Sequence, residues 1–203
     1  MRLRFAQTQP ISIAPAPTDG GRAKMKFEIL PLTAATGRCL SLENDPFPLL
    51  GRLVPRYDGR TWTVGEELWE TAGEKTYPPD PFEPADYMDS PDKALFLALA
   101  GEACLGRIRI GKSWNGDGRV EDLAVRRPCR GRGVGTALMD AAVAWAEEKG
   151  LDGLTLETQD NNLPACRFYL KYGFVLGGID ARVYHHTPHR KETALYFYLP
   201  LSL

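Results

Sequence analysis

The chain lacks the features that mark membrane-spanning, nucleic-acid-binding and disulfide-rich proteins. No apolar run approaches the roughly 18 residues that a membrane helix needs. The 25 Lys and Arg residues nearly balance the 26 Asp and Glu residues, so no basic face for nucleic acid is expected. The four cysteines form no C-x-x-C pair, which argues against common zinc and redox motifs, and scattered thiols are typical of the reducing cytosol. We therefore expect a cytoplasmic protein without a metal, a membrane or a nucleic acid as partner.

Residues 1–24 differ in composition from the rest of the chain. They contain three prolines and a Gly-Gly pair, and they are basic without the continuous apolar core or cleavage site of a signal peptide. Met25 then begins a strand-like run, MKFEILPL. The composition predicts a flexible N-terminal extension over residues 1–24 and a single domain over residues 25–203, a length that allows a sizeable core.

The hydrophobic periodicity predicts strands that alternate with helices in the C-terminal half. This order indicates an α/β sheet with at least one parallel crossover. The turn-rich segment SWNGDG predicts that the strand after it returns antiparallel, and a Tyr-Asp-Gly turn interrupts an extended stretch over 51–62. Strands are predicted over residues 26–32, 94–100, 104–110, 119–125, 153–159, 174–177 and 194–201, and helices over residues 36–44, 134–149 and 163–172.

The segment 66–92 is strongly acidic. Its five prolines predict that much of it is irregular. One interpretation is a solvated loop, and the other is a negatively charged wall that attracts a cationic substrate. Its only basic residue is Lys75, and its acidic residues are Glu66, Glu67, Glu70, Glu74, Asp80, Glu83, Asp86, Asp89 and Asp92.

A basic, glycine-rich segment follows the predicted strand 119–125. It reads R-x-x-G-x-G from Arg130 to Gly135 and leads into a helix. Glycine allows close approach of the backbone to a ligand, and a helix start offers unpaired N–H groups, so the segment predicts an anion site that suits a pyrophosphate. Arg130 and Arg132 add positive charge. Thr136 stands where a dinucleotide fingerprint needs its third glycine, and no lysine follows as in a P-loop.

A second pattern lies about 30 residues further on: Asn162-x-x-Ala165-x-x-x-Tyr169, followed by a Gly-Phe pair. In this order the two patterns resemble motifs A and B of the GNAT superfamily of acyl-CoA-dependent N-acetyltransferases. The segments GRLVPRYDG, VEDLAV, LETQDNN, ACRFY and ALYFYL are further similar to the streptothricin acetyltransferases, from about residue 25 to the end. The chain departs from that family at Cys129, where a tyrosine or similar residue is usual.

The resemblance implies a fold, a cosubstrate and a substrate class. The fold is α/β (α+β), with a mixed central sheet of about six to seven strands flanked by helices. The cosubstrate is acetyl-CoA, no metal is needed, and the acceptor is a small cation, the β-lysine amine of streptothricin. A homodimer is left open. The residues that would bind the cofactor are Leu123, Ala124, Val125, Arg130, Gly131, Arg132, Gly133, Val134, Gly135, Thr136, Asn162 and Ala165.

Acetyl transfer requires a neutral amine, and an alkyl amine with a pKa near 10.4 costs about 4 kcal/mol to deprotonate at pH 7.4. Glu121 and Asp122 are candidate bases on one strand. Strict alternation turns them to opposite faces, with Glu121 beside Leu123 and Val125, so only one can face the acceptor. The resemblance favours Glu121, and Glu157 is a third candidate.

The resemblance assigns two further roles. Tyr169 would protonate the departing thiolate, which suits its ordinary pKa of about 10. A backbone N–H within 123–125 would stabilise the oxyanion. Packing of Tyr169 beside Phe168 as an ordinary core aromatic is the alternative.

Several other residues invite functional interpretations that the sequence does not favour. The HHTPH segment, with His185, His186 and His189, lacks the H-E-x-x-H spacing of a metal site. Cys166 suits a buried helix position better than a nucleophile. The aromatic residues Tyr57, Trp62, Trp69 and Tyr87 could line an acceptor pocket or pack in the core.

Two alternatives for function stay open. The first is a GNAT enzyme that acetylates another amine, such as a polyamine, an aminoglycoside or a protein lysine. The second is a non-catalytic module that senses acyl-CoA, although the intact Asn162, Tyr169 and adjacent carboxylates argue against it.

Overall fold

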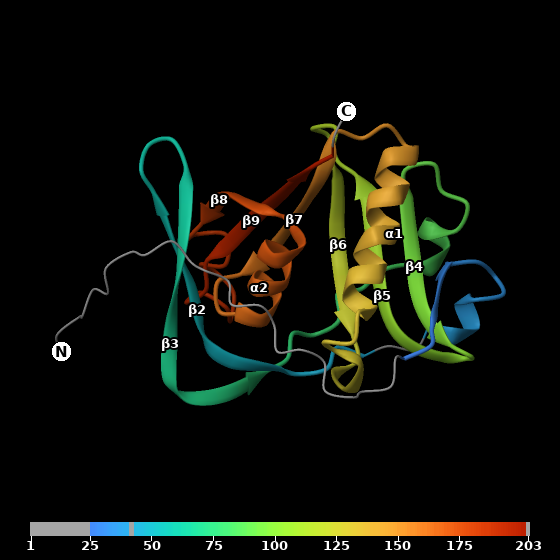
Figure 1. Ribbon diagram of the computed structural model, residues 1–203, viewed down its shortest axis with the longest axis horizontal. Coiled ribbons are helices and arrows are strands. Elements are labelled where there is room, and N and C mark those ends of the chain that lie inside the picture. The colour runs from blue at the N-terminus through green and yellow to red at the C-terminus, as the bar shows by residue number, and fades with distance from the viewer. Residues whose placement is uncertain (1–24, 41–42, 202–203) are drawn as a thin grey trace.

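The computed structural model describes residues 25–40 and 43–201, and the predicted extension over residues 1–24 lies outside them. Its central feature is a mixed sheet of seven strands in the order β1-β4-β5-β6-β7-β9-β8 (Figure 1). The parallel pair β6–β7 is joined by the crossover helix α1, and the other neighbours are antiparallel. The predicted mixed sheet is confirmed. The strands are β1 (Glu28–Pro31), β4 (Lys93–Ala100), β5 (Ala103–Lys112), β6 (Gly118–Val125), β7 (Gly153–Gln159), β8 (Val175–Asp180) and β9 (Ala194–Pro200).

Within the described residues, two α-helices and three 3-10 turns accompany the sheet. The helices are α1 (Val134–Glu148) and α2 (Leu163–Tyr172), and the turns are η1 (Gly37–Cys39), η2 (Pro84–Tyr87) and η3 (Arg127–Cys129). The predicted helix over 36–44 is wrong, since only η1 forms there in the described part. The backbone hydrogen bonds of η1 span three residues, from Cys39 N to Thr36 O and from Leu40 N to Gly37 O. The side chains of Thr33 and Thr36 form a hydrogen bond with each other just before it.

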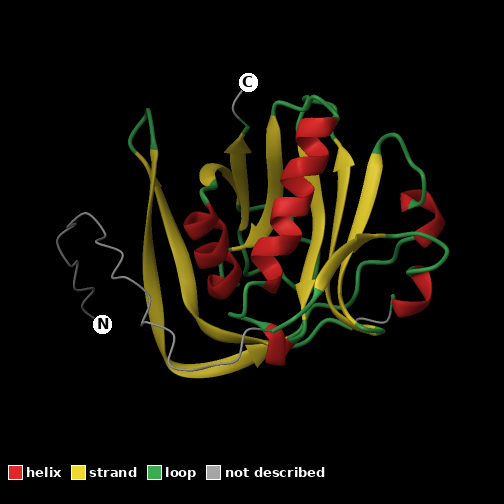
Figure 2. Cartoon of the chain, turned by 45° about the vertical axis from the view of Figure 1, so that its right-hand side comes forward, coloured by secondary structure: helices red, strands yellow, loops and turns green. Residues whose placement is uncertain are grey.

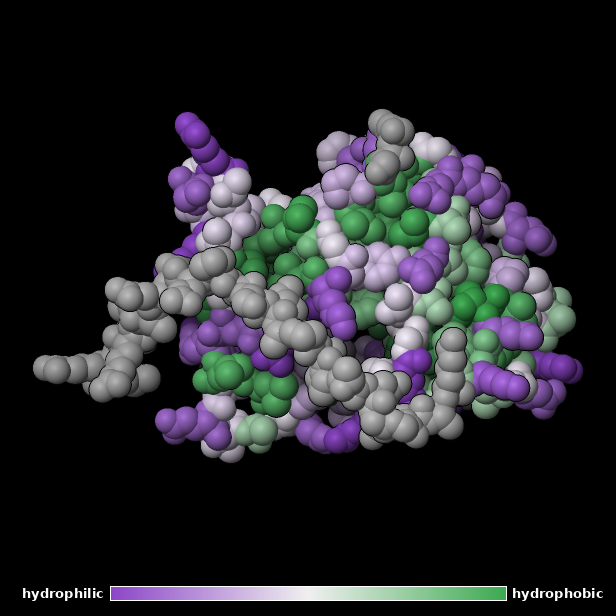
Figure 3. Space-filling view, in the orientation of Figure 1, coloured by the Kyte–Doolittle hydropathy of each residue, from purple (hydrophilic) through white to green (hydrophobic). Residues whose placement is uncertain are grey.

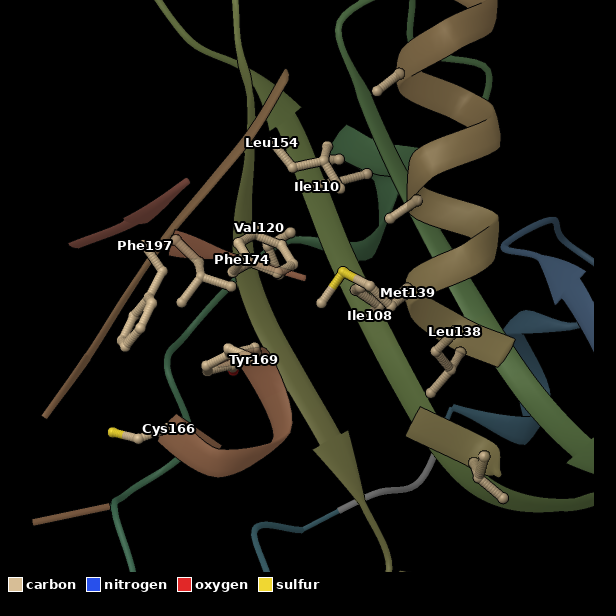
Figure 4. Packing of buried hydrophobic residues seen from close by; sticks show 14 of the residues in the cluster. Ile108, Ile110, Val120, Leu138, Met139, Leu154, Cys166, Tyr169, Phe174 and Phe197 are labelled. Atoms are coloured by element: carbon tan, nitrogen blue, oxygen red, sulfur yellow. The ribbon is translucent and has the colours of Figure 1, made fainter. Parts of the chain in front are cut away.

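The sheet separates two apolar clusters. On one face α1 buries Leu138 and Met139 completely against Ile108 and Ile110 of β5, and α2 joins the same cluster through Tyr169 (Figure 4). The alternation of a strand turns Arg109, the residue between those two isoleucines, to the other face. There η2 covers a smaller cluster that contains Leu95, Leu97, Leu99, Cys104 and Tyr87.

A second, two-stranded sheet is formed by β2 (Phe47–Tyr57) and β3 (Trp62–Lys75), which make a long hairpin beside α2 (Figure 2). The predicted turn after Tyr57 forms its tip, which is hydrophilic on the surface (Figure 3). The expectation of irregular chain is wrong for 66–75, which belongs to β3. The five prolines all lie later in the segment, whereas the acidic strand residues pair with cations: Glu67 with Arg52 at 2.8 Å, and Glu66 with Arg167 of α2 at 2.6 Å.

The hairpin depends on a glycine at a bulge, where the register shifts between Leu49 and Gly51. Gly51 has φ of 152°, and a Cβ there would lie 2.1 Å from the Glu67 carbonyl oxygen. We expect Gly51→Ala to lower the free energy of unfolding by about 1–3 kcal/mol through overpacking, measured by urea denaturation. Gly73→Ala is the control in the same hairpin, because its Cβ would meet only Leu49 side-chain atoms at ordinary contact distance. Equal stability of the two variants would contradict the prediction.

Candidate active site

The two parallel strands of the sheet diverge at their carboxyl ends. The ladder between β6 and β7 covers only Gly118–Val120, paired with Leu154–Leu156, after which the strands splay apart (Figure 1). A cleft of about 1630 Å³ lies at this point and reaches from the glycine loop before α1 to the base of the hairpin. The last residues of β6 therefore present a backbone edge that can bond a ligand.

A β-bulge in β6 turns two carboxylates to the same side. Asp122 pairs with Arg109 of β5 and Val120 pairs with Ile110, which makes Glu121 the extra residue. Glu121 accepts a hydrogen bond from the hydroxyl of Tyr87. Asp122 accepts one from Arg107 Nε at 2.7 Å.

The two acceptors share a face because their partners do. Arg107 and Arg109 are two residues apart on β5 and so point to one side, and Arg109 donates to the Tyr87 hydroxyl at 3.3 Å. Glu121 and Asp122 thus both face the side of η2, and both line the cleft. The expectation that alternation separates them, with Glu121 beside Leu123 and Val125, is wrong because the bulge breaks the alternation.

The carboxylates of the cleft differ in their partners. Asp122 is committed to a buried ion pair, since its side chain is 17% exposed and that of Arg107 only 6%. Glu121 is exposed and faces the cleft. Glu157 of β7 accepts from the Tyr184 hydroxyl at 2.6 Å and lies 3.6 Å from Arg119. Of the three candidate bases, Glu121 is the most exposed residue.

The glycine loop ends at the start of α1. Gly131 and Gly133 have φ of 71° and 86°, and a Cβ at either would meet no atom within 4 Å, so the loop is open to a ligand. The Ala137 N–H donates to the Gly133 carbonyl at 3.0 Å, and the first-turn amides before it have no partner within the helix. This geometry fits an anion such as a pyrophosphate.

Arg130 connects three backbone carbonyls around the loop. Its Nε donates to the Val125 carbonyl at 3.0 Å, and its two terminal nitrogens donate to the carbonyls of Pro46 and Asp45 at 2.7 and 2.9 Å. Three of the five N–H groups of this guanidinium are therefore engaged by backbone oxygens, and the other two have no hydrogen-bond partner among the described residues. Arg130 braces the loop against the start of β2 while still lining the cleft.

Most of the predicted cofactor-binding residues meet at the cleft. Arg132 and Val134 do not line it: Arg132 is exposed, and the side chain of Val134 is fully buried in the core. Val134 can contribute only its backbone to the first turn. The ten that line the cleft are Leu123, Ala124, Val125, Arg130, Gly131, Gly133, Gly135, Thr136, Asn162 and Ala165.

Helix α2 carries the second motif to the same cleft. Asn162 caps it, accepting from the Ala165 N–H at 3.4 Å. Tyr169 lines the cleft but is only 8% exposed, packed in edge contacts with Phe168 and Phe174. Burial, more than the nearby thiol and carboxylate, raises the pKa of the Tyr169 hydroxyl above its usual value. The hydroxyl therefore stays protonated at neutral pH.

The sequence matches a known family across these elements. A sequence model described as the Acetyltransferase (GNAT) family matches residues 62–174, which include the bulge, the glycine loop and α2. The chain belongs to the GNAT acetyltransferase family. It is an acetyltransferase, and the acetyl donor of this family is acetyl-CoA.

Relatives of this GNAT chain include named enzymes and solved structures. Streptothricin acetyltransferase A of Bacillus subtilis is 38% identical over 170 residues, which cover 84% of this chain and 98% of the relative. A Bacillus anthracis protein described as a streptothricin acetyltransferase, solved in complex with acetyl coenzyme A, is 32% identical with a TM-score of 0.80, covering 88% of this chain and all of that one. A nourseothricin acetyltransferase structure is 28% identical with a TM-score of 0.72, over 87% and 99% of the two chains. The similarity to the GNAT and streptothricin acetyltransferase families is confirmed.

Sequence reasoning missed the buried arginines of this GNAT domain. Arg107 and Arg109 are 5% and 2% exposed, and they support the two carboxylates of β6. The available signal was the alternation R-I-R inside an otherwise apolar strand, which places both cations on one face. Tyr87 was considered as a pocket aromatic, but it packs behind Glu121 rather than lining the cleft.

The acidic segment contributes less to the cleft than a charged wall would. Of its nine acidic side chains only Asp80 lines the cleft, and Asp86 and Asp92 pair with Lys93 and Lys112 at 3.7 and 3.1 Å. Tyr57, Trp62 and Trp69 also do not line it. Within residues 25–40 and 43–201, no helix is long and apolar enough to cross a membrane, and no three His, Cys, Asp or Glu side chains gather as metal ligands.

Proposed function

We propose that this enzyme transfers the acetyl group of acetyl-CoA to a primary amine of a small cation, the β-lysine amine of streptothricin. The observation that carries the proposal is the bulge in β6, which turns Glu121 and Asp122 together into the cleft beside the splayed strands. The substrate is supported by the 38% identity to streptothricin acetyltransferase A over nearly its whole length.

The donor is held mainly by backbone groups. The N–H groups of the loop from Gly131 and of the first turn of α1 bind the pyrophosphate, and the Asn162 side chain contacts the pantetheine arm. The free edge of 123–125 binds the remainder of that arm and offers an N–H to the carbonyl oxygen as it gains negative charge. Acetyl-CoA supplies an activated thioester when bound. Loop residues with little side chain suit this task, because the backbone must approach the ligand closely.

Glu121 accepts the proton that the amine must lose. It is the most exposed carboxylate of the three candidates and lines the cleft. Asp122 stabilises the site instead, since a proton taken up by this carboxylate would cancel the negative charge that balances the buried guanidinium of Arg107. Asp80 and Glu157 add negative charge to the cleft, which favours a cationic acceptor.

Tyr169 donates the proton that the departing thiolate takes up. Tyr169 lines the cleft from α2, and its hydroxyl forms no hydrogen bond with another described residue, so no protein group competes for its proton. Because burial raises its pKa, the group is protonated before transfer. Transfer is direct, and Cys166, buried with a raised thiol pKa, takes no part.

The test is thiol release from acetyl-CoA in the presence of different amines. We expect release with streptothricin at a kcat/KM at least tenfold above that with a polyamine, an aminoglycoside or a lysine peptide. Mass spectrometry of the product should show one added acetyl group on the β-lysine part. Release with another amine of the panel, and none with streptothricin, would contradict the substrate. Binding of acetyl-CoA without release to any amine would favour the sensing module.

A further inference from the structure

Glu121 is bound by a buried hydrogen-bond network whose residues, Tyr87 and Arg109, do not line the cleft. The Tyr87 hydroxyl donates to Glu121, and Arg109 donates to the Tyr87 oxygen at 3.3 Å and to Asp80 at 2.8 Å. Tyr87 is 6% exposed and Arg109 is 2% exposed. Neither residue lines the cleft, so both can affect an acceptor only through Glu121 and Asp80.

The direction of the hydrogen bonds in this network determines what Tyr87 donates to Glu121. A guanidinium can only donate, and a tyrosine hydroxyl has a single proton. Because the Tyr87 oxygen accepts from Arg109, its proton is directed to the carboxylate. Burial and the bond to Glu121 raise the pKa of Tyr87 to about 12, so the hydroxyl remains a donor at neutral pH.

Burying Arg109 for structural reasons alone would be costly. Its Nε is buried and has no hydrogen-bond partner among the described residues, and its guanidinium lies over the Phe82 ring at 4.5 Å. An unpaired buried donor costs free energy that a purely apolar side chain would avoid. The arrangement is therefore better explained by what the other two nitrogens hold in place, which are Tyr87 and Asp80.

The second oxygen of Glu121 lies beside Gly111, which has no side chain. A Cβ on Gly111 would lie 3.1 Å from Glu121 Oε1, closer than ordinary contact. The glycine leaves room for the carboxylate, whereas Tyr87 binds its other oxygen. One carboxylate oxygen is thus held by Tyr87, and the other fits only because residue 111 has no side chain.

We propose that the Tyr87 hydroxyl, oriented by Arg109, is a positioning group that fixes the Glu121 carboxylate for accepting the amine proton. The proton passes from the amine nitrogen to Glu121, and Tyr87 keeps its own proton throughout. This inference rests on the proposed function, in which Glu121 is the base. It adds two residues to the reaction that touch neither substrate nor acetyl-CoA.

The test is a double-mutant cycle between Tyr87→Phe and Glu121→Gln, read as kcat for thiol release with streptothricin. The phenylalanine keeps the ring and its contact with Phe82. We expect Tyr87→Phe alone to lower kcat about tenfold, as for a lost hydrogen bond to a charged group, with the KM for acetyl-CoA nearly unchanged. The melting temperature should fall modestly, because Arg109 loses an acceptor. In the Glu121→Gln background Tyr87→Phe should cause no further loss of kcat, because a structural defect would persist there but a positioning defect would not.

A matched control and a second perturbation sharpen the result. Tyr184→Phe removes a similar hydroxyl, which donates to Glu157 at 2.6 Å, and its effect should be the same in both backgrounds. Gly111→Ala displaces the carboxylate without touching Tyr87 and should also lower kcat at unchanged stability. Full activity of Tyr87→Phe, or an equal loss in both backgrounds, overturns the positioning role alone. Full activity of Glu121→Gln overturns the proposed base and the inference with it.

Discussion

Replacing Glu121 with glutamine is expected to lower kcat/KM for the amine by about 100-fold or more, the usual contribution of a general base. Glutamine keeps the size and an oxygen that can accept from Tyr87, but it cannot take up a proton. The variant must then rely on substrate whose amine is already neutral in solution. Below the amine pKa near 10.4, the concentration of this neutral form increases about tenfold per pH unit. The deficit should therefore shrink as the pH rises, which a pH profile of thiol release at saturating acetyl-CoA measures.

Asp122→Asn distinguishes the role of Asp122 from that of Glu121, the other carboxylate at the bulge. Its side chain is committed to Arg107, and both are largely buried. Removing one partner of such a pair costs roughly 3–5 kcal/mol, so we expect the main effect on the free energy of unfolding. If Glu121→Gln instead keeps the wild-type rate while a folded Asp122→Asn loses it, the base is Asp122.

Tyr169→Phe is the second substitution with a large expected effect, a fall in kcat of about 100-fold. The ring packs against Phe168, Phe174 and Phe197, and phenylalanine preserves those contacts. Only the hydroxyl is lost, and with it the proton for the departing thiolate. The affinity for acetyl-CoA should change little, because the expected contacts of the donor are to the glycine loop and Asn162.

Two measurements distinguish this role from packing. Single-turnover kinetics give the rate of the chemical step, and calorimetric titration gives the dissociation constant of acetyl-CoA. A slower chemical step with an unchanged dissociation constant for acetyl-CoA supports Tyr169 as the general acid. Unchanged turnover would remove Tyr169 from the mechanism and leave it as a core aromatic of α2.

The sequence predicted the C-terminal half of the fold well because its signals there are local. The glycine pair before α1, the cap Asn162 and the apolar stripe of α1 each act within a few residues of themselves. The segment 66–92 was harder, because the strand β3 exists only through its pairing with β2, and its exposed faces carry no apolar alternation. The helix expected over 36–44 is wrong for another reason, since Cys39, Leu40 and Leu42 are too few apolar residues to stabilise it.

The signals for the proposed cofactor site were equally local, so the sequence by itself predicted its residues. A backbone loop and a capped helix have fixed spacings along the chain, so Gly131, Gly133, Asn162 and Tyr169 could be named together with the family. Only the tertiary structure decided which way the acids point. The bulge at Glu121 arises from the register between β5 and β6, and no property of β6 alone reveals an extra residue. The roles of Tyr87 and Arg109 have the same origin, because 34 and 12 residues of chain separate them from Glu121 and only folding brings their polar atoms into contact.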